Sequence, residues 1–326
     1  MKAWYIFYKN ILKNNLVEQK DKIIISVSGG IDSVCMLHMF WRIKKKIDID
    51  ILVVVFNHKL RKESNYESNF VNNLSCKFNI RCIKKTINVK KYSKEKSISI
   101  ETAARNLRYS NLINIAKEYK YNKIATAHNA NDNAETMFMW LIRGTGSFIG
   151  IPQTRQIDNN VCVIRPLLQI NRKFIEQYIK FHNLNFCVDK SNFFNKYTRN
   201  KIRSKIIPIC EEINPMAIEH IFNLTEIQRI ENEYLEKIVH KFMKKCVKMY
   251  KNKILLDLAI FLRYNKPVMF RIIKHVLPEK KYNSCINLII NKIISNDSSI
   301  YKISNDWIFF LKLNKACFYN INKTKY

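Results

Sequence analysis

The sequence has little glycine, few acidic residues and no hydrophobic run long enough to span a membrane. Only 5 of the 326 residues are glycine, which excludes a collagen-like chain, and 47% are hydrophobic, which excludes a disordered one. Its longest apolar stretches, such as residues 51–56, are strand-sized, whereas a membrane helix needs about 18 residues. The first residues show no secretory signal. We therefore expect a cytoplasmic, globular protein that does not associate with membranes.

Cysteine spacing and net charge limit the kinds of ligand that we expect the protein to bind. None of the 9 cysteines forms a C-x-x-C pair, so we expect reduced core thiols rather than a zinc or redox motif. Lys and Arg number 57 against 26 Asp and Glu, and the resulting net charge of +31 attracts polyanions such as nucleic acid. A/T-biased codons would also enrich Lys, Asn and Ile, so the charge by itself leaves RNA binding open.

Strand-like and helix-like segments alternate through the first half of the chain. Apolar and β-branched runs predict strands at Lys22–Val27, Ile49–Phe56, Arg81–Ile87 and Asn122–Ala127. Helical periodicity predicts helices at Val34–Lys46, Ser64–Asn79 and Ile98–Lys120. This alternation is typical of βαβ units, which build a parallel sheet whose ligands bind beyond the carboxyl ends of the strands.

The pattern becomes mainly helical in the second half. Residues 214–251 indicate a long helical stretch, further helices are expected near 266–277 and 282–294, and Trp307–Leu313 with Ala316–Ile321 predict a β-hairpin. We therefore predict an α/β domain over residues 1–213, with a five-stranded and largely parallel sheet. A mostly helical domain that ends in the hairpin is predicted over residues 214–326.

The segment SGGIDS, residues 28–33, directly follows a predicted strand and opens a helix. Adjacent glycines let the backbone approach a ligand, and the amides of a helix N-terminus favour an anion, so the segment predicts a phosphate site. It is no Walker A loop, because Asp32 stands where that loop has Lys. A carboxylate beside phosphate implies a bridging Mg²⁺ or a role in positioning the reacting group. The alternative is that Asp32 or Ser33 only caps the helix.

This arrangement resembles the pyrophosphate loop of the N-type ATP pyrophosphatases, which split ATP between its α and β phosphates and transfer AMP. Further motifs resemble the tRNA(Ile)-lysidine synthetase family. They are NHKLR from Asn57, ETAAR from Glu101, Ala127-His128 with Asp132 and Glu135, RGTG from Arg143, IRPLL from Ile164, DKSN from Asp189 and RNKIR from Arg199. The chain departs from the family pattern at Val55, Lys59, Asn131 and Asn133, which affects substrate geometry rather than the reaction class.

The resemblance implies an adenine-nucleotide-hydrolase-like, Rossmann-like sheet and a tRNA-binding C-terminal domain. It further implies that ATP and Mg²⁺ are used to adenylate O2 of the wobble cytidine in the CAU anticodon of an isoleucine tRNA. The ε-amine of free L-lysine then attacks C2 and releases AMP. The product, lysidine, changes codon specificity from AUG to AUA. The oligomeric state stays open, a homodimer included.

The resemblance also implies roles for individual residues. Those of the loop, which would bind ATP, are Ser28, Gly29, Gly30, Ile31, Asp32 and Ser33, with Asp32 also holding Mg²⁺. Those at the catalytic centre are Asp32, Arg105, Asp132 and Glu135. Those that would bind lysine are Arg105, His128, Asp132 and Glu135. Those that would bind tRNA are His58, Arg61, Arg108, Arg199 and Arg203.

Local patterns allow simpler explanations for several of these residues. His128, Asp132 and Glu135 share one helical face that suits an ammonium group, but Asp132-x-x-Glu135 would equally serve as a capping box. The arginine pairs 105/108 and 199/203 would also occur on solvated helices. A loop after a strand in a basic protein often carries a histidine and an arginine by chance, so His58 and Arg61 need not have a function.

Two other functions stay in view. A tRNA thiolase would use the same loop, but it needs cysteine pairs or an iron–sulfur cluster, and C-x-x-C is absent. A non-catalytic, basic RNA-binding protein would not need the carboxylates Asp32, Asp132 and Glu135.

Overall fold

The structure is a computed structural model that describes all residues except 1, 59–63, 145–148, 188–197, 278–282 and 322–326. The chain divides into two compact units, Met1–Gln228 (unit 1) and Arg229–Tyr326 (unit 2). The division falls within helix α10 (Ala217–Cys246), later than the functional boundary at 213/214 that the sequence predicts. That boundary stays a prediction, because compactness and function need not divide a chain at the same residue.

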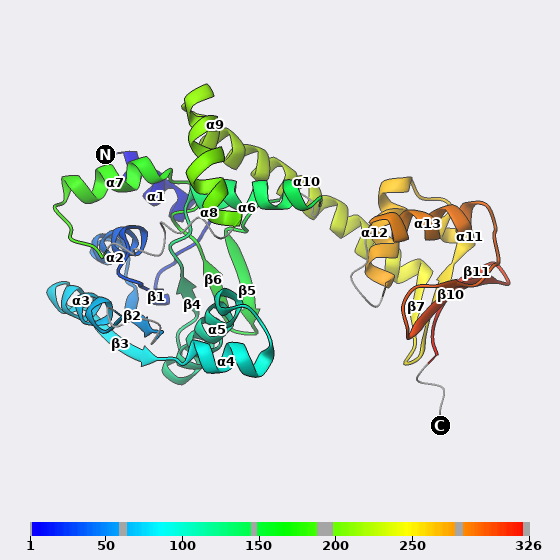
Figure 1. Cartoon of the computed structure of the whole chain (residues 1–326), viewed down its shortest axis with the longest axis horizontal. Helices are drawn as coiled ribbons and strands as arrows, with labels where there is room; N and C mark the ends of the chain where they lie inside the picture. Colours follow the sequence, from blue (N-terminus) through cyan, green and yellow to red (C-terminus); the bar gives the residue numbers. More distant parts are fainter. Residues whose placement is uncertain (1, 59–63, 145–148, 188–197, 278–282, 322–326) are drawn as a thin grey trace. The chain divides into compact units, whose positions relative to one another are not determined.

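Unit 1 is built around a six-stranded sheet with the order β3-β2-β1-β4-β6-β5 (Figure 1). Its strands are β1 (Lys22–Ser26), β2 (Asp50–Asn57), β3 (Arg81–Thr86), β4 (Lys123–Ala125), β5 (Thr154–Asp158) and β6 (Val161–Ile164). Five strands pair in parallel, as predicted, and β5 pairs with β6 in the antiparallel direction at the edge. The sequence analysis missed β5 because its residues, TRQID, contain no apolar run.

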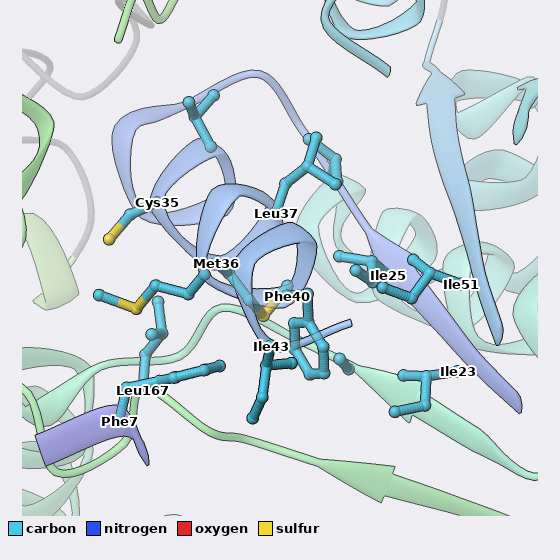
Figure 2. Close-up of a cluster of buried hydrophobic side chains, with 14 of the residues drawn as sticks. Phe7, Ile23, Ile25, Cys35, Met36, Leu37, Phe40, Ile43, Ile51 and Leu167 are labelled. Atoms are coloured by element: carbon cyan, nitrogen blue, oxygen red, sulfur yellow. The ribbon is translucent and has the colours of Figure 1, made fainter. Parts of the chain in front are cut away.

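Helices cover both faces of this sheet. They are α1 (Lys2–Lys13), α2 (Ile31–Ile43), α3 (Ser64–Lys77), α4 (Val89–Lys96), α5 (Ile100–Tyr119), α6 (Ala130–Arg143) and α7 (Arg172–Phe181). In β1, Ile23 and Ile25 belong to a buried cluster with α1, α2 and α7, part of which Figure 2 shows. Ile24, which points to the opposite face, belongs to a second cluster with α5. Burial on both faces explains why this strand is an unbroken apolar run.

Unit 1 ends in a helical segment that packs on α6. The segment consists of α8 (Thr198–Lys201), a π-helical turn (Ile202–Ile206), α9 (Ile207–Ile213) and the first part of α10. Ile202, Ile207 and Ile218 are buried against Ala130 and Ala134 of α6. This packing fixes the segment beside the carboxyl end of β4, where α6 begins.

Unit 2 contains an antiparallel sheet with the order β7-β8-β11-β10-β9. Its strands are β7 (Val247–Met249), β8 (Lys253–Asp257), β9 (Tyr301–Lys302), β10 (Trp307–Lys312) and β11 (Lys315–Asn320). Its helices are α11 (Leu258–Phe261), α12 (Lys266–Val276), α13 (Asn283–Ile294) and the remainder of α10. Sheet residues Leu256, Phe309 and Phe318 share one core with Ile272 and Ile289 of the helices.

The helices and the β10–β11 hairpin of unit 2 confirm the prediction, but the hairpin is part of a larger sheet. Strand β7 follows α10 without a break, so in the sequence it looks like a continuation of the helix, and β9 has only two residues. The predicted long helix therefore ends at Cys246 rather than near residue 251. Within the part of the chain that is described, no helix combines the length and apolarity that a membrane crossing requires.

Candidate active site

The predicted phosphate loop lies between β1 and α2, at the carboxyl end of the parallel sheet. The Ser33 hydroxyl accepts a hydrogen bond from the Ser28 amide at 3.2 Å and donates one to the Gly30 carbonyl at 2.8 Å. Helix α2 begins at Ile31, earlier than predicted, and its N-cap is Gly30, which offers no side chain. The interpretation of Asp32 or Ser33 as the N-cap is therefore wrong, because both lie within the first turn.

The two glycines of the loop differ in how strictly the backbone requires them. Gly29 has a φ of +88°, and a Cβ there would lie 3.4 Å from Cys187 Sγ and 3.5 Å from a methyl carbon of Val71. The Cys187 amide also donates to the Gly29 carbonyl at 2.9 Å. Gly30 has an ordinary φ of −71°, and a Cβ there would meet only Ser28 Oγ, at 3.5 Å. The fold thus demands glycine at position 29 but not at position 30.

Asp32 is held by side chains from two other segments. Its Oδ1 accepts a hydrogen bond from Asn129 Nδ2 at 3.0 Å, and its Oδ2 pairs with a terminal guanidinium nitrogen of Arg172 at 3.0 Å. Burial raises the pKa of Asp32 above its usual range, against the opposing charge of Arg172, and the negative charge of Asp132 adds to the rise. A further cation that approached this buried carboxylate would stabilise its charged form.

Asp132 and Glu135 lie at the start of α6, and two arginines neutralise them. Arg199 donates from Nε to Glu135 at 2.6 Å and from a terminal nitrogen to Asp132 at 2.9 Å. Arg203 donates from Nε to Glu135 at 2.6 Å and from a terminal nitrogen to Asp132 at 3.3 Å. The Glu135 side chain is 1% exposed, whereas those of Arg199 and Arg203 are 30% and 40% exposed. The four residues form a charge cluster that is buried at Glu135 and reaches solvent at the two arginines.

The capping box of α6 differs from the predicted one. Asn129 is the N-cap: its side chain accepts from the Asp132 amide, and the Asp132 carboxylate accepts from the Asn129 amide, each at 3.0 Å. Glu135 takes no part in this box, so the predicted Asp132-x-x-Glu135 pairing is wrong. Asp132 both caps the helix and binds arginine, and Asn129 links it to Asp32.

His128 lies just before α6, and its Nδ1 is 3.1 Å from the Thr126 hydroxyl oxygen. Burial, followed by the positive charges of Arg165, Arg108 and other arginines nearby, lowers the pKa of His128 to about 3. The imidazole is therefore neutral at physiological pH.

The remaining predicted residues that the structure describes, Arg105, Arg108 and His58, lie on or beside α5. Arg105 is exposed, and its guanidinium lies 5.4 Å from the centre of the Tyr109 ring, while Arg108 is half-buried. Burial lowers the pKa of His58, and Arg108 lowers it as well, so these two residues are electrostatic neighbours. The His58 Nδ1 atom is buried and has no hydrogen-bond partner among the residues that the structure describes. Arg61 lies outside the described residues.

Sequence reasoning missed Asn129 and Arg172 and predicted only tRNA contacts for Arg199 and Arg203. Asn129-x-x-Asp132 carries a capping signature that would have revealed Asn129. Arg172 is the first residue of α7, and only the fold brings it to Asp32. Its amide donates to Asn131 Oδ1 at 2.9 Å, so one of the departures from the family pattern helps to place this arginine.

Comparisons with known proteins show which family the chain is similar to. The model of the PP-loop domain family matches residues 5–210. A tRNA(Ile)-lysidine synthase from Thermosipho africanus is 45% identical over 220 residues, which cover 68% of this chain and 51% of that protein. Another from Clostridium acetobutylicum is 34% identical over 335 residues, which cover 97% of this chain and 72% of that protein.

The chain belongs to the tRNA(Ile)-lysidine synthase family. This confirms the resemblance that the motifs predict. The chain spans 51% and 60% of the lengths of the relatives from Thermosipho africanus and Clostridioides difficile, respectively. Among solved structures, the U34-tRNA thiolase NcsA from Methanococcus maripaludis, with its 4Fe–4S cluster, matches with a TM-score of 0.60 and 18% identity. The match covers 69% of this chain and 76% of that one, and it shows a shared fold.

Proposed function

We propose that this protein ligates lysine to C2 of the wobble cytidine in the CAU anticodon of an isoleucine tRNA, at the expense of ATP, and so forms lysidine. The observation that carries the proposal is the meeting of a glycine-rich anion loop with Asp32, Asp132 and Glu135 at one end of the sheet, in a chain of this family. The loop suits the pyrophosphate of ATP, and the carboxylates suit the ammonium group of lysine.

In the first step, the loop amides would hold the pyrophosphate while AMP passes to O2 of the cytidine. Asp32 is the residue that would hold Mg²⁺, and its burial and its proximity to Asp132 both favour an added cation. Its Oδ2 would have to leave Arg172 to do so. Bound Mg²⁺ would neutralise the charge of the leaving group. Arg172, once released from Asp32, would be available to pair with a phosphate.

In the second step, lysine would bind at Asp132 and Glu135 by exchange. Three carboxylates, Asp32, Asp132 and Glu135, are balanced by three guanidinium groups, those of Arg172, Arg199 and Arg203. An ammonium group therefore enters only if an arginine leaves. The displaced arginine would then be available for a phosphate of tRNA, which reconciles the predicted tRNA contacts with the observed ion pairs.

Arg105 and His128 would complete the lysine site. Arg105 is exposed and positively charged, which suits the carboxylate of the amino acid. A histidine with a pKa of about 3 is a weak base at neutral pH, so His128 would hydrogen-bond rather than take the proton of the amine.

The net charge of +31 and the predicted tRNA domain support a polyanionic substrate. Binding of tRNA should weaken steeply with salt, with a log–log slope of roughly −0.7 to −0.9 for each phosphate neutralised. A slope near zero would show that the charge is a feature of composition rather than of recognition.

The alternative function, a tRNA thiolase, is supported only by the fold that the chain shares with NcsA. Within the described residues, the one cluster of three or more side chains able to hold a metal ion contains no cysteine, although all nine cysteines lie in that part. This arrangement does not favour a cluster-dependent thiolase.

The deciding experiment incubates the protein with ATP, radiolabelled lysine and unmodified isoleucine tRNA that carries a CAU anticodon. Label in the RNA, dependent on ATP, supports the proposal, and a tRNA with a different anticodon serves as the control. Tight tRNA binding without labelling would favour the non-catalytic alternative. Incorporation of sulfur in place of lysine would favour the thiolase.

A further inference from the structure

Unit 2 holds a cluster of metal-ligating side chains that the proposed reaction does not use. Glu236 and His240 lie four residues apart on α10, so they occupy one face of the helix. His275 lies near the end of α12. One carboxylate oxygen of Glu236 and one ring nitrogen from each histidine lie within 4.8 Å of one another. All three residues belong to the same compact unit.

The geometry of the cluster shows that the three groups already converge. His275 Nε2 lies 2.6 Å from Glu236 Oε2, and the ring centres of His240 and His275 are 5.3 Å apart. Both histidines are exposed and Glu236 is half-buried, so an ion would reach the cluster from solvent. Arg271 lies on the far side of the carboxylate, with its Nε 3.6 Å from Glu236 Oε1, and also donates to Asn232 at 3.2 Å.

We propose that Glu236, His240 and His275 bind a single borderline divalent cation of the zinc class. Two imidazoles and one carboxylate are the donors that zinc takes when a fourth position is left to water. Tetrahedral bonds of about 2.0–2.1 Å place ligand atoms roughly 3.3 Å apart. This spacing is wider than the 2.6 Å between His275 Nε2 and Glu236 Oε2 and lies within the 4.8 Å that bounds the three ligand atoms. Small side-chain rotations suffice to admit the ion, which would tie α10 to α12.

Arg271 has a defined part in this site. It contacts the oxygen of Glu236 that faces away from His275, which leaves Oε2 for the ion. A charged partner outside the set of ligands orients a ligating carboxylate in this way. Its positive charge also opposes the cation, so we expect micromolar rather than tighter affinity. The competing explanation is that Glu236 and His275 form only a hydrogen-bonded pair on the surface.

Titration of the untagged, full-length protein with Zn²⁺ and Co²⁺ tests the site without recourse to the reaction. One equivalent of Zn²⁺ should bind in calorimetry and raise the unfolding temperature, and Co²⁺ should develop the visible absorption of nitrogen and oxygen coordination. His240→Ala and His275→Ala should each weaken Zn²⁺ binding by about 100-fold, since even outer-shell changes cost about 10- to 100-fold.

His220→Ala is the matched control, because His220 is also an exposed histidine on α10 but lies outside the cluster. It should bind Zn²⁺ as the unaltered protein does. The proposal is overturned if the unaltered protein binds Zn²⁺ only at millimolar concentration. It is also overturned if His240→Ala and His275→Ala, both folded by circular dichroism, retain its affinity.

Discussion

Each of the neighbouring strands β1 and β4 is followed at its carboxyl end by one aspartate of the site, but the two ends are built differently. At β1, the proposed anion site consists mainly of backbone amides of a glycine turn. The Asp32 carboxylate beside it is held by one side-chain amide and one guanidinium group. At β4, Asp132 caps its own helix and shares two arginines with Glu135. The first end is shaped for an anion before any ligand arrives, whereas the second is already filled with cations.

This contrast indicates that the two ends respond differently to substrate. A loop of backbone amides needs no rearrangement to receive a phosphate. To bind the ammonium group of lysine as proposed, the cluster of Glu135 with Arg199 and Arg203 would exchange one cation for another, so its occupancy would depend on relative affinities. Substitutions at the first end should therefore abolish a step, and those at the second should shift an equilibrium.

The largest effect is expected for Asp32→Asn. Loss of the charge should slow adenylation of tRNA by about 100- to 1,000-fold, the range seen when one stabilising group leaves a reaction centre. The free energy of unfolding should stay level or rise, because burial disfavours the charged form of Asp32. Single-turnover formation of adenylated tRNA measures the first quantity and urea unfolding the second. Asp48→Asn, at an exposed residue outside the site, is the control. Adenylation at the normal rate would remove Asp32 from the mechanism.

Glu135→Gln and Arg203→Gln should move the affinity for lysine in opposite directions. Removing the carboxylate takes away an ammonium partner, so KM for lysine should rise about tenfold or more. Removing Arg203 eliminates a competitor, so KM for lysine should fall while tRNA binding weakens. The Glu135 variant should also lose roughly 2–4 kcal/mol of unfolding free energy, somewhat below the cost for a fully buried pair, because both arginines are partly exposed.

Steady-state titrations of lysine at saturating ATP and tRNA measure these shifts, with adenylation followed separately. The exposed Glu118→Gln on α5 is the matched control for Glu135. If KM for lysine rises in both variants, the arginines support the site structurally and do not compete with the substrate.

Alanine substitutions at the two glycines separate folding from ligand contact. Gly29→Ala should lower the free energy of unfolding by about 1–2 kcal/mol, because alanine is strained at positive φ. Gly30→Ala should stay within about 0.5 kcal/mol of the unaltered protein, since its backbone is ordinary and its added Cβ meets only Ser28 Oγ. If Gly30→Ala nevertheless loses use of ATP, position 30 serves the approach of the ligand. Equal losses of stability would contradict the distinction.

The sequence predicted the end at β1 more fully than the end at β4, for a physical reason. The glycines and Asp32 are contiguous, and the strand before them is marked by burial on both faces, so local patterns suffice. Arg199 and Arg203 reach Glu135 across more than sixty residues of chain, and Arg172 reaches Asp32 across 140. No local pattern encodes such meetings. In unit 2, the short strands β7 and β9 gained their structure from neighbours rather than from their own residues.

His128 adds a pH dependence to the end at β4. In the unfolded chain this histidine gains a proton near its ordinary pKa of 6.5, whereas in the folded protein its pKa is about 3. Below about pH 6.5 the histidine therefore binds a proton in the unfolded state but not in the folded state. As the pH falls further, the free energy of unfolding decreases by up to about 1.4 kcal/mol per pH unit. Above that pH the residue contributes no slope.

Urea unfolding between about pH 7 and pH 5 should show a shallower decline in His128→Asn than in the unaltered protein. Some decline will persist, since the pKa of His38 is also lowered, to about 4. His220→Asn, at an exposed histidine outside the site, is the control substitution. Equal slopes in the unaltered protein and His128→Asn would show that the imidazole gains its proton without cost, and that neither burial nor the surrounding arginines disfavour its charged form.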